Sequence, residues 1–250
     1  MRVATSYPGS PTPEIASAIA SIPRERNPMY FEFSVNEKVA TEVAFGASIN
    51  GHLSCVFFKS VGLNVAADTF VQLSMMELIG GMVIVLGDDP GANSSQNEQD
   101  NRHYAHLSYT PVFEPATPSE VYVMFKQTAD LSRKLRMPVI VRLSTHVCHA
   151  KEKVDFGPMP VHEHGNKPLF CMENGPYIPI AADALKMKRR TLHKFWELKD
   201  LLEELPVNIV EDNSSERGVI TAGAPYLSLM DVLEEVEDKP DVMKLGIVLS

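Results

Sequence analysis

Glu37 stands where a predicted strand gives way to a predicted helix, a place from which a carboxyl group can hold or transfer a proton. Residues 29–33 alternate large apolar and polar side chains, as a short strand does. Asn36 offers a side-chain oxygen to cap the helix that follows. Apolar residues then recur at helical spacing at Val39, Ala40, Val43, Ala44 and Ala47. Taken alone, the local pattern favours the simpler role, in which Glu37 complements the helix dipole, worth about 0.3–1 kcal/mol.

Two other clusters contain side chains that bind metals elsewhere. Asp88 and Asp89 follow an apolar run, and Mg²⁺ is held by one or two carboxylates plus phosphate oxygens. A Gly-Asp sequence after a buried strand more often forms a plain turn. Other ligand types are scattered at His146, Cys148, His149, His162 and His164. On the end of a strand, the spacing of the first three does not put them on one face. We predict no metal site in this chain.

Strand-like and helix-like segments alternate through residue 145 and must position these groups. The expected strands cover residues 2–6, 29–33, 53–58, 82–86, 111–115 and 138–143. Helices are expected after Thr12 and Asn36, after a loop at residues 60–64 and ending near Glu77, and over residues 119–136 with Ser119 as the cap. The alternation predicts an α/β fold, a mostly parallel sheet sandwiched by helices.

Four polar or glycine-containing segments come directly after predicted strands: residues 7–12, 35–37, 60–63 and 88–102. Ligands of open parallel sheets bind beyond the carboxyl ends of the strands. We therefore expect these segments to meet at one edge as a single candidate site. The sequences G-x-G-x-x-G, G-x-x-x-x-G-K-[ST] and G-x-S-x-G are missing from the chain, so the dinucleotide, P-loop and α/β-hydrolase interpretations lack their motifs.

Beyond residue 150 the pattern changes. Periodicity fails and Pro, Gly and His accumulate up to residue 174, as in a linker or extended arm. A helix is expected at 186–205. Strands at 207–210, 218–221 and 243–249, with a helix at 226–237, open a second α/β unit. We divide the chain into residues 1–150, a linker or arm with a helix at 151–205, and an incomplete second α/β domain at 206–250.

Composition and charge exclude several classes of protein. The chain has 250 residues and a formal net charge of -9, which argues against a nucleic-acid or anionic-membrane surface. It has no apolar run long enough to span a membrane. Its three cysteines, Cys55, Cys148 and Cys171, cannot all pair within the chain and show no C-x-x-C spacing. We expect a reducing cytoplasm and no iron–sulfur cluster bound by this chain.

Four motifs, in this order, carry a family resemblance: Tyr7-Pro8-Gly9-Ser10-Pro11, Asn36-Glu37-Lys38, Val61-Gly62-Leu63-Asn64-Val65-Ala66-Ala67-Asp68, and Asp88-Asp89-Pro90-Gly91 running into Ser94-Ser95-Gln96-Asn97-Glu98-Gln99-Asp100-Asn101-Arg102. The combination resembles the α subunits of indolepyruvate:ferredoxin oxidoreductases, within the thiamine-diphosphate-dependent 2-oxoacid:ferredoxin oxidoreductases. The resemblance covers residues 1–150 strongly and 206–250 loosely. It implies that residues 1–150 form a pyrimidine-binding thiamine-diphosphate domain.

The resemblance also implies roles for particular residues. The family's glutamate falls on Glu37, where it would bond N1′ of the aminopyrimidine and favour the imino tautomer that takes the proton from thiazolium C2. Other residues would line the cofactor and substrate cleft: Tyr7, Pro8, Gly9, Ser10, Ser60, Gly62 and Leu63. The implied reaction is oxidative decarboxylation of an aryl, indolepyruvate-like 2-oxoacid to an acyl-CoA, with ferredoxin as electron acceptor.

The chain departs from the family pattern in ways that predict partners. It begins directly at a strand where family members have a further helix, and the Gly-Asp-Gly…Asn signature for Mg²⁺ and diphosphate is missing, as is the cysteine-rich ferredoxin-like domain. We expect Mg²⁺ and iron–sulfur clusters to be bound elsewhere in a complete enzyme. A second copy or partner subunit would supply the diphosphate site, in a homodimer or heterotetramer, and this chain alone would be inactive. Two alternatives stay open: half of a non-oxidative thiamine-diphosphate decarboxylase, and a non-catalytic interaction domain.

Overall fold

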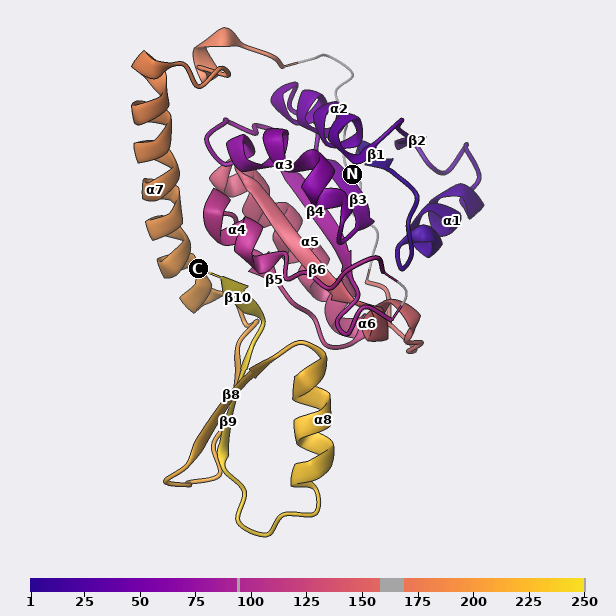
Figure 1. Cartoon of the computed structure of the whole chain (residues 1–250), viewed down its shortest axis with the longest axis vertical. Coiled ribbons are helices and arrows are strands. Elements are labelled where there is room, and N and C mark those ends of the chain that lie inside the picture. Colours follow the sequence, from indigo (N-terminus) through magenta and orange to yellow (C-terminus); the bar gives the residue numbers. More distant parts are fainter. Residues whose placement is uncertain (94, 158–168, 250) are drawn as a thin grey trace.

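A computed structural model describes residues 1–93, 95–157 and 169–249. Its main sheet has seven strands in the order β10–β5–β6–β4–β3–β1–β2 (Figure 1). These strands are β1 (Val3–Ser6), β2 (Tyr30–Phe33), β3 (Ser54–Lys59), β4 (Met82–Asp88), β5 (Val112–Phe113), β6 (Pro138–Ser144) and β10 (Ile247–Leu249). All neighbours pair in parallel except β10 with β5. The predicted α/β architecture with a mostly parallel sheet is confirmed.

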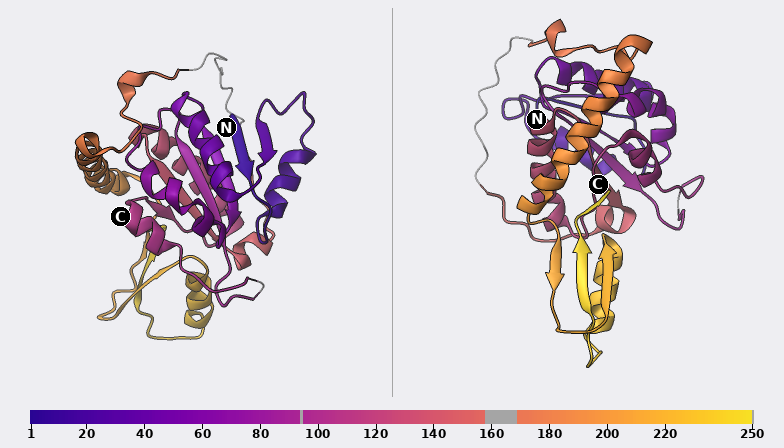
Figure 2. Two further views of the ribbon diagram at one scale, coloured as in Figure 1. Left: turned by 45° about the horizontal axis from the view of Figure 1, so that its top comes forward. Right: turned by 90° about the vertical axis from the view of Figure 1, so that its left-hand side faces the viewer.

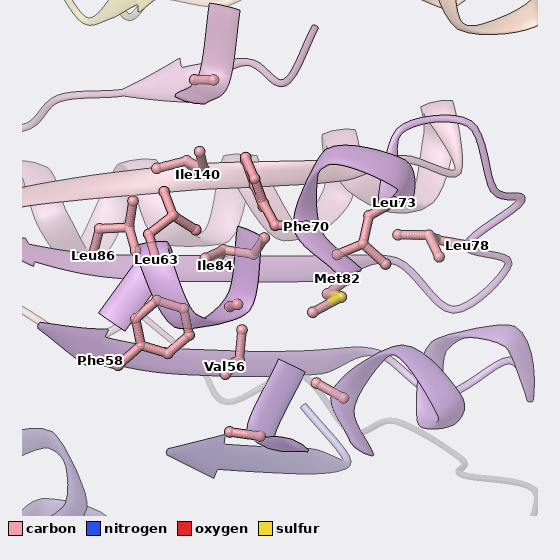
Figure 3. Close-up of a cluster of buried hydrophobic side chains, with 14 of the residues drawn as sticks. Val56, Phe58, Leu63, Phe70, Leu73, Leu78, Met82, Ile84, Leu86 and Ile140 are labelled. Carbon is pink, nitrogen blue, oxygen red and sulfur yellow. The ribbon is translucent and has the colours of Figure 1, made fainter. Parts of the chain in front are cut away.

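Helices cover both faces of this sheet. One face is covered by α2 (Glu37–Ile49), α3 (Gly62–Leu73) and α4 (Arg102–Ser108), and the other by α1 (Pro13–Ser21), α5 (Pro118–Leu135) and α6 (Thr145–His149). Alternate residues of β3 enter opposite cores: Val56 and Phe58 pack under α2 and α3, while Cys55 and Phe57 face α1 and α5. Figure 3 shows the first of these cores. Burial on both faces explains the continuous apolar runs of the central strands.

The helix α7 (Ala181–Glu204) packs along the edge of this body (Figures 1 and 2). Met187 and Leu198 are buried in the apolar clusters of the main sheet. Glu77, also buried, lies 2.9 Å from Arg190 Nε and 2.6 Å from Lys194 Nζ of α7. These contacts fix the helix to the first 150 residues, while an apolar stripe alone would leave its register less well defined.

A smaller sheet projects from the body in Figure 2. It contains β7 (Ile209–Glu211), β9 (Asp241–Leu245) and β8 (Gly218–Ala222), in that order, with α8 (Ala224–Leu233) beside it. The chain then returns to the main sheet as β10. Gly246 makes this return possible, because a Cβ there would lie 2.2 Å from the Val207 carbonyl oxygen. The predicted division at residues 150 and 205 stays a prediction, although α7 and β10 both pack against the first 150 residues.

Several local predictions need correction. The predicted strand at residues 243–249 is split at Gly246 into two strands of different sheets. Thr117, not Ser119, caps α5, because the Thr117 hydroxyl accepts from the Glu120 amide and Pro118 takes the first helical position. The helix predicted to reach Glu77 ends at Leu73. Among the described residues, no helix is long and apolar enough to span a membrane.

Candidate functional site

The chain reverses direction across the sheet between β1 and β3. From β1 it passes through α1 to β2 on one side, and from β2 through α2 to β3 on the other side of β1. Such a switch point leaves a crevice at the carboxyl ends of the two strands. The segments that follow β1 and β3 flank this crevice, and Glu37, which opens α2 just after β2, lies next to them.

Glu37 is the first residue of α2. The Asn36 side-chain oxygen accepts the Val39 amide at 2.9 Å, which confirms the predicted cap. The Glu37 side chain is half-buried and rests on Gly62, the first residue of α3. A Cβ at Gly62 would lie 2.6 Å from Glu37 Cγ and 2.7 Å from its Oε1. Within the described part of the chain, the Glu37 carboxyl makes no hydrogen bond or ion pair, so a ligand can use it.

Ser60 and Leu63 are buried on either side of Gly62. The Ser60 amide donates to the Gly87 carbonyl at 2.9 Å, continuing the ladder between β3 and β4. Leu63 is fully buried in the apolar core below α3. The turn that presents Gly62 to Glu37 is therefore fixed both by the sheet and by the core.

The segment after β1 borders the same region. Tyr7, Pro8 and Ser10 are exposed, with Tyr7 at 37%. Gly9 lies against Lys59 at the end of β3, where a Cβ would come within 3.1 Å of Lys59 Cβ. The same segment meets β4, since a Cβ at Gly87 would lie 2.6 Å from Thr12 Cγ2. The structure thus brings all four predicted segments to one edge of the sheet; which of their residues bind a ligand stays a prediction.

The segment after β4 rests on a buried charge network that the sequence interpretation missed. Asp88, predicted as a turn residue, is 1% exposed and accepts from Arg142 Nε at 2.5 Å and from Asn101 Nδ2 at 2.7 Å. Arg142 Nη1 also donates to Glu114 Oε1 at 2.5 Å. Burial raises the pKa of Asp88, and the charge of Arg142 opposes this shift. An arginine in the otherwise apolar strand Pro138–Ser144 was the available signal, because buried charges need partners.

Asp100 and Arg102 extend the network to the surface. Arg102 donates through Nε and Nη2 to both carboxylate oxygens of Asp100 at 2.7–2.9 Å. These hydrogen bonds lower the pKa of Asp100 to about 2. Arg102 Nη1 also lies 3.6 Å from Glu114 Oε2. Ser94, part of the motif in this segment, lies outside the described residues.

A cavity of about 510 Å³ opens at a second reversal of the chain, between β4 and β6. Asp89 and Asn93 line one side, and Thr145, His146 and His149 the other. The histidines belong to α6 and not, as predicted, to the end of a strand. In the described residues no three His, Cys, Asp or Glu side chains are placed to hold a metal ion. His162 and His164 lie outside those residues.

Comparison with known proteins identifies the family to which the chain belongs. Residues 1–192 match the family model described as pyruvate flavodoxin/ferredoxin oxidoreductase, thiamine diphosphate-binding. The chain belongs to this family.

Individual relatives narrow the comparison to particular enzymes. The chain is 39% identical over 246 residues to the indolepyruvate oxidoreductase subunit IorA of Methanothermobacter marburgensis, and equally so to that of Methanothermobacter thermautotrophicus. Each match covers 98% of this chain but 39% of the relative, so the chain spans about two fifths of their length. The 2-oxoglutarate:ferredoxin oxidoreductase of Magnetococcus marinus has the same fold, with a TM-score of 0.75 and 17% identity over 99% of this chain and 50% of that one.

The residues at the β1/β3 crevice fit the aminopyrimidine end of thiamine diphosphate. Gly62 lets the Glu37 side chain lie directly against the start of α3, in the space that any Cβ would take, and the Glu37 carboxyl makes no hydrogen bond or ion pair within the described residues. A half-buried carboxyl beside a glycine can meet a flat heterocycle at one ring nitrogen.

Proposed function

We propose that this chain is the pyrimidine-side part of a thiamine-diphosphate-dependent 2-oxoacid:ferredoxin oxidoreductase that acts on an aryl, indolepyruvate-like 2-oxoacid. The observation that carries the proposal is the contact between Glu37 and Gly62 at the switch point of the sheet. The substrate class rests on the names of the relatives, which are called indolepyruvate oxidoreductase subunits.

The chain's own residues would bind and orient the cofactor. Thiamine diphosphate, when bound, supplies the electron sink for decarboxylation of a 2-oxoacid. Glu37 would hold a proton at a carboxylate oxygen and share it with the pyrimidine nitrogen N1′. Gly62 would let that carboxyl lie directly against the start of α3, and the buried residues Ser60 and Leu63 would hold Gly62 in place. Tyr7, Pro8, Gly9 and Ser10 would form the opposite, more exposed wall.

Other parts of the reaction are proposed to lie outside this chain. A partner subunit or second copy would hold Mg²⁺ and the diphosphate, and iron–sulfur clusters bound elsewhere would pass electrons to ferredoxin while CoA accepts the acyl group. We expect a homodimer or heterotetramer in the cytoplasm, where the three free thiols would stay reduced. The chain by itself should oxidise no 2-oxoacid.

The test uses the complete enzyme containing this chain. Glu37→Gln is nearly isosteric and should lower the rate of C2 proton exchange of bound thiamine diphosphate by about 10²–10⁴, the usual range for positioned proton transfer. Glu42→Gln is the matched control: Glu42 lies on the same helix but is exposed and contacts Lys38 and Thr69. Exchange that is unchanged in Glu37→Gln would remove Glu37 from the mechanism.

A second assay separates the alternatives. Indolepyruvate-dependent reduction of ferredoxin that requires CoA supports the oxidoreductase. Release of an aldehyde without electron transfer would indicate a non-oxidative decarboxylase. A complete complex that binds no thiamine diphosphate would leave this chain as an interaction domain.

A further inference from the structure

Asn101 is a buried amide that connects two of the segments at the candidate site. It is 1% exposed. Its Nδ2 donates to the Ser60 carbonyl at 3.2 Å and to Asp88 Oδ1 at 2.7 Å, and its Oδ1 accepts from Gln99 Nε2 at 2.8 Å. Both amide hydrogens and the amide oxygen are therefore used, as a buried amide requires.

Several donors share the Ser60 carbonyl that accepts from Asn101. It also accepts from Gln99 Nε2 at 3.0 Å and from the Leu63 amide at 3.2 Å, the bond that opens α3. Gly62 lies between Ser60 and Leu63 and contacts Glu37. A movement of the Ser60 carbonyl would therefore move Gly62 relative to the Glu37 carboxyl.

Asn101 is itself held in place by the sheet. Its acceptor Asp88 ends β4 and is paired with Arg142 of β6, which is 7% exposed. The path from Arg142 through Asp88 and Asn101 to Ser60 consists of buried groups in direct contact. A shift of one group in this path should shift the next, because buried polar groups have no water to replace a lost hydrogen-bond partner.

We propose that Asn101 is a positioning residue: its amide holds the Ser60–Gly62 turn against Glu37 and thereby sets the proton-transfer geometry of the candidate site. The inference rests on the proposed function for the role of Glu37. Gln99 cannot replace Asn101, since Gln99 is half-exposed and, among the described residues, makes no hydrogen bond to Asp88.

Asn101→Asp is the sharpest substitution. It keeps the shape of the side chain but replaces an amide donor with a carboxylate that faces two acceptors, the Ser60 carbonyl and Asp88. Asn93→Asp is the matched control, because it adds the same charge in the same segment, where Asn93 is exposed and bonds the Pro90 carbonyl at 3.3 Å.

Three measurements on the complete enzyme test the inference. In the cofactor-free protein, Asn101→Asp should increase amide deuterium uptake in a peptide covering residues 60–64, whereas Asn93→Asp should not. With thiamine diphosphate, its dissociation constant should change less than about threefold, because the diphosphate site lies elsewhere. The C2 proton-exchange rate should fall about tenfold, less than the roughly 10²-fold loss from a full 1 Å misplacement, because Glu37 itself is kept.

A pH profile separates positioning from general damage. The carboxyl group introduced by Asn101→Asp regains one O–H donor when it is protonated, and two neighbouring carboxyls favour sharing a proton. The exchange rate of Asn101→Asp relative to wild type should therefore recover as the pH is lowered from 8 to about 5.5. A variant that merely loosens the fold would show no such recovery.

The outcomes are distinguishable. If Glu37→Gln lowers exchange but Asn101→Asp changes neither exchange nor deuterium uptake, the positioning role is refuted and the proposed function stands. If Glu37→Gln leaves exchange unchanged, the proposed function fails first. If Asn101→Asp does not fold, the milder double variant Asn101→Ser with Gln99→Met removes both side-chain amide donors to the Ser60 carbonyl and leaves the Leu63 amide in place. Unchanged exchange in that variant refutes the proposal.

Discussion

Gly62→Ala tests the contact on which the candidate site depends. The new Cβ would lie 2.6 Å from Glu37 Cγ, 2.7 Å from its Oε1 and 3.0 Å from its Cδ. Restoring an ordinary contact of 3.4 Å to the nearest of these atoms requires a displacement of about 0.8 Å. Glu37 is a flexible side chain, so we expect its carboxyl to move while the backbone stays in place.

Stability and function should therefore respond differently. Alanine is favoured over glycine in helices by up to about 1 kcal/mol, less at the first position of α3, and this gain offsets the crowding. We expect the free energy of unfolding to change by no more than about 1 kcal/mol. A displacement approaching 1 Å of a reacting group lowers the rate by about 10²-fold, or about 2.7 kcal/mol in the barrier.

The assay is C2 proton exchange of bound thiamine diphosphate in the complete enzyme, with thermal unfolding measured in parallel. Gly46→Ala is the matched control: Gly46 lies within α2, and a Cβ there would meet nothing within 4 Å. That control should gain about 0.5–1 kcal/mol in stability and keep the wild-type exchange rate.

Two results would refute this reasoning. Wild-type exchange in Gly62→Ala would mean that Glu37 does not act from its position beside Gly62. Equal loss of exchange in Gly62→Ala and Gly46→Ala would mean that glycine substitution in these helices damages the enzyme without regard to the Glu37 contact.

Other predictions follow from charges and packing. Asp100→Asn should cost about 1 kcal/mol or less at neutral pH, because solvent reaches the half-buried Asp100 and screens its ion pair. Urea unfolding should show this difference above pH 4 and its loss as the pH falls toward about 2, since pairing lowers the pKa of Asp100. Burial raises the pKa of Cys55 to about 12, so iodoacetamide should label it only after unfolding, as mass spectrometry can determine. Gly246→Ala should destabilise the fold by more than about 2 kcal/mol in thermal unfolding, since its Cβ would overlap the Val207 carbonyl.

The parts of the fold that follow local rules could be predicted from the sequence. Asn36 caps α2 because a short side-chain oxygen precedes a helical apolar pattern. The runs at Ser54–Lys59 and Met82–Asp88 are central parallel strands because both faces are apolar. The meeting of the loops followed from the rule that parallel strands share one carboxyl edge.

The parts that depend on distant partners could not be predicted in this way. Arg142 and Glu114 are 28 residues apart, and only the fold brings their side chains to 2.5 Å. The division of residues 243–249 between two sheets depends on the Val207 carbonyl that Gly246 approaches. Ser119 and Thr117 both belong to residue types that cap helices. Pro118 favours Thr117 as the cap, because proline suits the first position of a helix.

The charge network also explains how the smaller sheet is joined to the site. Gly223 precedes α8 with φ +57°, and a Cβ there would lie 2.9 Å from Glu114 Oε1. The positive end of the α8 dipole therefore lies against a carboxylate that also pairs with Arg142. Arg142 in turn binds Asp88, on which Asn101 and the Ser60 turn depend. The smaller unit thus meets the buried charges that support the candidate site.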